Sequence, residues 1–296
     1  MSVELRNNIA GAPLLWWIGF HVAVLALIVA DALLPHSRRD KPRPRLSWMW
    51  SAFVALVAAG FAFWLNYEQG HQTALEFVSG YVIETSLSVD NLFVFLILFR
   101  GFGISYKQQH RALLWGVGGA ILLRAVFIAL GVSLLAHFAW VTYIFGAILL
   151  YASWRLLRGN TAGDAVPGWI TNMQKGSVSL LPVILAVEAT DLLFAIDSIP
   201  AVLAVSRDPF VVYTSNIAAI LGLRSLYFAL SSLLDRFHYL HYGLGALLAF
   251  VALKMLSAHW IEIPVVWSLA IMAAILGLCA LASVFIPQSQ HKSPAA

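Results

Sequence analysis

The sequence of this protein carries very little charge for its length. Only 11% of its 296 residues are Asp, Glu, Lys or Arg, whereas hydrophobic residues make up 61%. Soluble domains carry roughly 25% charged residues, so too little charge is present to cover a surface that faces water. The shortage excludes an ordinary soluble domain and indicates a membrane protein.

Cysteine is also nearly absent, because Cys279 is the one cysteine of the chain. It can form neither an intrachain disulfide nor a cysteine-based metal centre. The sequence has no H-E-x-x-H motif and no nucleotide-binding loop. The net charge of +4 comes from basic residues in short loops, which is typical of membrane topology rather than of a nucleic-acid partner.

Long apolar segments take the place of the missing charge. A helix that crosses a bilayer needs about 20 mostly apolar residues. We predict an all-α, polytopic membrane protein that forms a single membrane domain over residues 1–296, with about nine transmembrane helices. They are expected at residues 13–34, 46–66, 75–99, 112–136, 138–157, 180–205, 210–232, 238–257 and 265–286.

The basic residues predict the orientation of these helices. Most of the 18 lysines and arginines fall in loops on one side, which is therefore expected to be cytoplasmic. Arg6, Arg207 and Lys254 are assigned to the outer side, and Arg124 and Arg224 fall inside spans. We therefore expect a bacterial inner-membrane protein with its N-terminus outside and its C-terminus in the cytoplasm.

The chain also resembles itself. Glu84 and Asp90 are followed by Asn91 in the third span, and Asp191 and Asp197 are followed by Ser198 in the sixth. Arg124 and Arg224 lie in similar contexts in the fourth and seventh spans, and residues 145–157 of the fifth resemble residues 244–256 of the eighth.

Two units of three helices must insert with opposite orientations, so the sequence predicts a three-plus-three inverted repeat, which is typical of transporters. The predicted divisions are two N-terminal helices (1–74), repeat one (75–158), a cytoplasmic linker (159–179), repeat two (180–257), and a C-terminal helix and tail (258–296).

Five carboxylates lie inside the predicted spans, and two arginines cannot neutralise them. Carboxylate, amide and hydroxyl oxygens suit Mg, Ca and Mn rather than Cu or Zn. We therefore predict a site for a divalent cation at the membrane midplane. Its candidate ligands are Glu84, Asp90, Asn91, Glu188, Asp191, Asp197 and Ser198.

The two intramembrane arginines have two interpretations. Arg124 and Arg224 are either static ion-pair partners that fix helix packing, or gating groups that hold the empty carboxylates and release them when metal binds. Pro200 is expected to free a carbonyl oxygen in the sixth span. Asp31 is expected to be solvated near an interface, and His21 to be a polar residue with satisfied hydrogen bonds.

The two acidic segments resemble a known family. E-T-S-L-S-V-D-N-L-F-V-F (84–95) and E-A-T-D-L-L-F-A-I-D-S-I-P-A (188–201) are similar to the two signatures of the TerC family of integral membrane proteins. T-S-N-I-A-A-I-L-G-L-R-S-L-Y-F (214–228) and L-K-M-L (253–256) fit as well. The resemblance implies a link to tellurium resistance and manganese export, and a place among LysE-type exporters.

We therefore expect a secondary exporter of Mn(II), with Mg or Ca as other possible ions, and not an enzyme. The expected partners are membrane lipid, the divalent metal ion and protons as a coupling ion; no organic cofactor, nucleic acid or oligomeric state is assigned. The alternatives are an intramembrane metalloenzyme with aspartate-activated water, a membrane assembly or insertion factor, and a tellurite-resistance component without direct metal transport.

Overall fold

The computed structural model describes residues 8–9, 12–33, 44–130, 132–158, 180–234, 240–257, 260 and 263–285. The predicted linker, residues 159–179, lies outside the described residues. The described part is a helical bundle with one short β-hairpin before its first helix, in which β1 (Asn8–Ile9) pairs antiparallel with β2 (Ala12–Pro13). The all-α prediction is thus confirmed, apart from this hairpin.

Each predicted span overlaps one helix. The helices are α1 (Leu14–Leu33), α3 (Pro44–Glu68), α4 (His71–Gly101), α5 (Tyr106–Leu130), α6 (Val132–Leu157), α9 (Leu181–Leu203), α10 (Pro209–Leu234), α11 (Leu240–Ser257) and α12 (Val265–Phe285). Six of them, α1, α3, α4, α5, α10 and α12, are long and apolar enough to cross a membrane within the described residues. The protein is therefore a multi-pass membrane protein.

Glycine and proline set several helix ends. Gly70, with φ 96°, separates α3 from α4, and Gly103, with φ 63°, follows the end of α4. Both take the left-handed backbone conformation that residues with a Cβ atom rarely adopt. Pro182 lies in the first turn of α9. Backbone N–H groups in the first turn of a helix have no partner within the helix, so the N–H that proline lacks costs no hydrogen bond there. The helix continues through Pro200 to Leu203, so the structure shows no local unwinding there.

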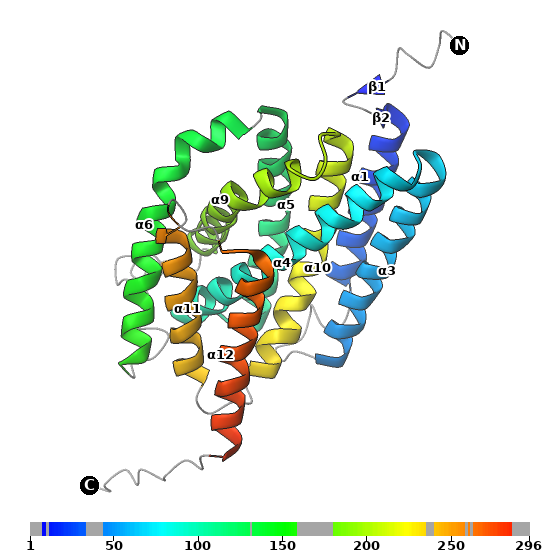
Figure 1. Ribbon diagram of the computed structural model, residues 1–296. Helices are drawn as coiled ribbons and strands as arrows, with labels where there is room; N and C mark the ends of the chain where they lie inside the picture. Colours follow the sequence, from blue (N-terminus) through cyan, green and yellow to red (C-terminus); the bar gives the residue numbers. More distant parts are fainter. Residues whose placement is uncertain are drawn as a thin grey trace, which may run out of the picture.

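The helices divide into a buried centre and a lipid-facing periphery. In the apolar stretch of α10, 89% of residues are buried, against 12% in α12 and 17% in α1. The outer helices instead expose large apolar side chains such as Leu15, Phe63 and Leu278. A water-soluble monomer rarely exposes so much apolar surface, whereas lipid solvates it. Figure 1 shows α4 running obliquely through the bundle.

Small residues allow the central helices to approach closely. A Cβ added to Gly80 of α4 would lie 2.6 Å from Ser215 Oγ of α10 and 3.1 Å from Val202 Cγ1 of α9. Gly116 of α5 lies equally close to α9, at Val187. Farther along, the rings of Phe99 and Tyr227 pack edge to face at 5.5 Å. The backbones of α4, α5, α9 and α10 are therefore held together around one buried centre.

The pair α6 and α11, side by side in Figure 1, makes reciprocal contacts. A Cβ at Gly146 of α6 would lie 3.0 Å from Leu256 Cγ of α11, and a Cβ at Gly245 of α11 would lie 2.9 Å from Leu157 Cγ of α6. Ser153 Oγ also donates to the Gly245 carbonyl at 2.8 Å. When residues 145–157 are aligned with residues 244–256, Gly146 matches Gly245, and Leu157 matches Leu256. Matched positions thus contact each other in both directions.

The close approach at Gly80 can be tested by adding one methyl group. We expect Gly80→Ala to lower the free energy of unfolding by about 1–3 kcal/mol, because the buried neighbours must shift. Gly60→Ala is the matched control, since no atom lies within 4 Å of its added Cβ and alanine favours a helix by up to about 1 kcal/mol. Thermal unfolding of both purified variants in detergent measures the difference. If the two variants unfolded at the same midpoint temperature, the contact between α4 and α10 at Gly80 would be loose enough to accept a methyl group.

Candidate functional site

Helix α4 presents a row of buried polar side chains at its middle. Glu84, Ser88, Asp90 and Asn91 are each at most 3% exposed. Positions 84, 88 and 91 are four and three residues apart, so these side chains share one face of the helix. Ser88 Oγ donates to Glu84 Oε1 at 3.0 Å. So polar a face in the centre of an apolar bundle requires partners from neighbouring helices.

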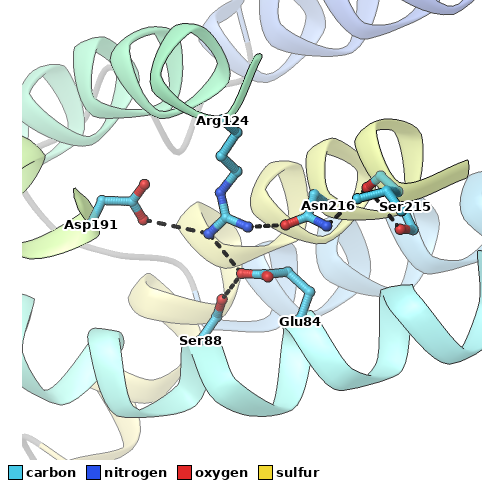
Figure 2. Close-up of polar contacts among 7 residues, drawn as sticks. Glu84, Ser88, Arg124, Asp191, Ser215 and Asn216 are labelled. Atoms are coloured by element: carbon cyan, nitrogen blue, oxygen red, sulfur yellow. Dashed lines mark hydrogen bonds and ion pairs between the residues drawn. The ribbon is translucent and has the colours of Figure 1, made fainter. Parts of the chain in front are cut away.

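Arg124 of α5 supplies one such partner. Its side chain is fully buried, and Nη2 lies 2.7 Å from Glu84 Oε1 and 3.9 Å from Asp191 Oδ1. Its Nη1 donates to Oδ1 of Asn216, whose own amide donates to the Val212 carbonyl at 2.9 Å. Figure 2 shows the guanidinium between these groups. One cation is thus shared by two carboxylates and an amide, so this cluster holds one more carboxylate than cations.

Lys254 of α11 binds the second buried acidic residue of α4, Asp90. Its Nζ donates to Asp90 Oδ2 at 2.9 Å and to Ser268 Oγ of α12 at 3.1 Å. The Lys254 side chain is 18% exposed, against 5% for that of Asp90. Each of the two buried carboxylates of α4, Glu84 and Asp90, therefore has its own cationic partner, from a different helix.

A cavity of about 20 Å³ lies between the two ion pairs. This is room for roughly one water-sized species. Its wall contains Glu84, Leu87, Ser88, Asp90, Asn91, Phe194, Ser198, Val251, Lys254 and Met255.

Four buried oxygens of that wall have no hydrogen-bond partner among the described residues. They are Glu84 Oε2, Asp90 Oδ1, Asn91 Oδ1 and Ser198 Oγ. Buried polar atoms are nearly always paired in proteins. Four such oxygens on the residues around one cavity form a donor set that could bind a cation or a water molecule.

The remaining predicted ligands lie elsewhere. Asp191 is held by Arg124 and lines a second cavity of about 30 Å³ together with Arg224. Glu188 packs on α5, where a Cβ at Gly119 would meet its carboxylate at 2.0 Å. The side chain of Asp197 lies outside the described residues. Within the part of the chain that the structure describes, no three His, Cys, Asp or Glu residues form a metal-binding group.

Arg224 is paired with a residue that the sequence placed in water. Its Nη2 forms an ion pair with Asp31 of α1 and donates to His110 Nε2 of α5 at 3.2 Å. Asp31 is 5% exposed, so the expectation that it is solvated is wrong. The reason is that α1 packs against α10 and brings Asp31, its one acidic residue, to the buried arginine. His21 Nδ1 donates a hydrogen bond to the Trp17 carbonyl at 2.7 Å, and its Nε2 forms a hydrogen bond with the Tyr213 hydroxyl at 2.9 Å, as expected.

Sequence reasoning missed three residues of the site: Ser88, Asn216 and Lys254. Ser88 follows Glu84 by one helical turn, which was an available signal. Asn216 and Lys254 stand in segments that carry the family resemblance. Lys254 was assigned to the outer end of the predicted span 238–257 without a role in the site. It lies in the last turn of α11, and its side chain reaches Asp90.

Comparison with known proteins identifies the family. Residues 69–291 match the family described as integral membrane protein TerC family. The chain belongs to the TerC family. No solved structure matches it.

Several relatives match nearly the whole chain. An uncharacterized membrane protein of Myxococcus xanthus is 38% identical over 95% of this chain and 94% of its own length. Alx of Escherichia coli strain K12, named as a proposed membrane-bound redox modulator, is 38% identical over 91% of this chain and 94% of its own length. An uncharacterized membrane protein of Rickettsia bellii is 35% identical, with 90% and 96% covered.

Removal of the central cation should destabilise this TerC protein. Arg124→Met leaves Glu84 and Asp191 buried without their cation, so we expect a loss of about 3–5 kcal/mol in unfolding free energy. Adding Glu84→Gln to that variant should restore part of the loss, because one uncompensated charge is gone. Arg111→Met, an exposed site on the same helix, is the control. Thermal unfolding in detergent reports all three, and wild-type stability of Arg124→Met would show that Arg124 does not hold the cluster together.

Proposed function

We propose that this protein is a secondary transporter that exports a divalent metal cation, with Mn(II) as the preferred ion, through the cavity between α4, α9 and α11. The observation that carries the proposal is the set of four orphaned oxygens around one cavity. A carboxylate, amide and hydroxyl donor set suits hard cations such as Mn(II), Mg(II) and Ca(II). Asp197, next to Ser198 in sequence, stays a predicted ligand.

The state of each carboxylate favours entry of a cation. Glu84 binds Arg124 and Ser88 through Oε1 and keeps Oε2 free, while Asp90 binds Lys254 through Oδ2 and keeps Oδ1 free. An arriving ion can therefore contact one free oxygen of each carboxylate before any internal ion pair breaks. Arg124 and Lys254 keep the empty site from being an uncompensated pair of buried anions, which would be costly.

The proposed architecture consists of nine spans that contain a three-plus-three inverted repeat. The reciprocal contacts of Gly146 with Leu256 and of Gly245 with Leu157 support it, since a two-fold axis relates contacts in this way. A site at the interface of two such repeats opens to the two sides in turn as one repeat moves against the other. The proposed placement is the bacterial inner membrane, with the N-terminus outside and the C-terminus in the cytoplasm.

The proposed coupling ion is the proton, and the proposed transporter is not an enzyme. The redox role in the name of the Escherichia coli relative has no counterpart in a dithiol here, because the chain has one cysteine. A membrane assembly factor, or a tellurite-resistance component that moves no metal, is the alternative function. Neither gives the orphaned oxygens of the cavity a chemical task.

Metal transport can be measured directly in inside-out membrane vesicles, where export becomes uptake. We expect Mn(II) uptake by the wild-type protein and background uptake by Asp90→Asn, because the amide keeps the size of the side chain but removes the charge that binds the ion. Asp197→Asn should behave in the same way. Cells that carry either variant should become sensitive to manganese.

Glu76→Gln is the matched control, since Glu76 lies on the same helix, is partly exposed and accepts a hydrogen bond from Gln72 at 3.1 Å. It should transport normally. Membrane fractionation must show equal amounts of all variants. Normal uptake by both aspartate variants would overturn the proposed site, and the absence of uptake by the wild-type protein would favour the assembly-factor alternative.

A further inference from the structure

Lys254 differs from the other buried cations in how it is held. Arg124 is fully buried and has partners on three other helices. Lys254 is 18% exposed, lines the cavity, and has one carboxylate partner, Asp90, and one hydroxyl partner, Ser268. A lysine side chain is a point charge on a flexible stem. Of the two cations that neutralise the cavity, Lys254 is therefore the one that can exchange with an incoming ion.

Lys254 also has a second position within reach. It belongs to the last turn of α11, where carbonyl groups at the helix C-terminus attract a positive charge. Ser268 of α12 is already 3.1 Å from Nζ and is not among the residues that line the cavity. An ammonium displaced from Asp90 can stay bound to Ser268 and the end of α11, so its displacement does not require a free charge in the hydrocarbon.

We propose that Lys254 is a tethered counter-ion that makes the cavity selective for divalent over monovalent cations. The inference rests on the proposed function and adds a specificity determinant to it. The ammonium occupies Asp90 at the high effective concentration that a covalent tether provides. A monovalent ion that displaces the ammonium from Asp90 leaves the net charge at that carboxylate unchanged. Its binding therefore gains little Coulomb energy. A divalent ion brings a further charge, which the free oxygen of Glu84 also attracts.

The same contacts explain how the ion can leave. When a metal ion dissociates, the tethered ammonium returns to Asp90 and prevents the carboxylate from remaining buried and uncompensated. Release therefore needs no second ion from solution at Asp90. Without Lys254, the site should bind cations more tightly, release them more slowly and discriminate less between charges.

The test measures Mn(II) binding to the purified full-length protein. The electron paramagnetic resonance signal of free Mn(II) reports how much of the ion stays unbound. Each titration is run once with an uncharged osmolyte and once with about 150 mM NaCl in its place. That salt also screens exposed charges, with a Debye length of about 8 Å, so Lys107→Met, an exposed lysine on α5, serves as the control. For Lys254→Met we expect Mn(II) affinity to rise at least tenfold, and NaCl to weaken it at least fivefold more than in the wild-type protein.

Lys254→Arg is the second variant, for the case that Lys254→Met does not fold. It keeps the positive charge beside Asp90, so we expect it to fold. Because a guanidinium can bind both oxygens of a carboxylate, this variant should bind Mn(II) several-fold more weakly than the wild-type protein. NaCl should weaken its Mn(II) binding no more than in the wild-type protein. A folded Lys254 variant with wild-type affinity and wild-type Na⁺ response would overturn the inference while leaving the metal site intact. If no variant binds Mn(II), the proposed function fails together with it.

Discussion

The structure depends on one requirement, that the fully buried guanidinium of Arg124 be neutralised. No single helix can meet it. Arg124 projects from α5, and its partners Glu84, Asp191 and Asn216 come from α4, α9 and α10. The energetic cost of an unpaired charge in an apolar medium therefore fixes four helices around one point. Small residues such as Gly80 and Gly116 allow these helices to come close enough for the contacts to form.

The Arg124 cluster also explains why the neighbouring cavity is polar. Arg124 cannot satisfy both Glu84 and Asp191 fully, and Lys254 binds only one oxygen of Asp90. Glu84 and Asp90 each keep one oxygen without a hydrogen-bond partner among the described residues, and both residues line the cavity of about 20 Å³. The fully buried Arg124 holds Glu84, whereas the partly exposed Lys254 holds Asp90 and itself lines the cavity. The proposed metal transport uses both, because the site must keep its shape and still release the ion.

The two arginines at matched positions have different partners. Arg124 uses Glu84 and Asp191, which are themselves matched positions of the two proposed repeats, and so leaves neither for Arg224. Asp31, from a helix outside both proposed repeats, pairs with Arg224 instead. Helix α1 therefore contributes a counter-charge as well as lipid-facing surface. The matched arginines therefore have different counter-charges, although their sequence contexts are alike.

The sequence by itself determined the class of the fold and most of the polar centre. Its shortage of charge required a membrane protein, its apolar segments gave the helices, and Glu84, Asp90 and Arg124 were evident because charges in apolar segments are rare. Only the tertiary structure decided which charges meet. Lys254 and Asp31 lie near the ends of apolar segments, where a sequence cannot distinguish a solvated charge from one that reaches inward. Glu188 and Asp191 share a segment with Ser198, yet only Ser198 lines the cavity, because packing against α5 turns the other two away.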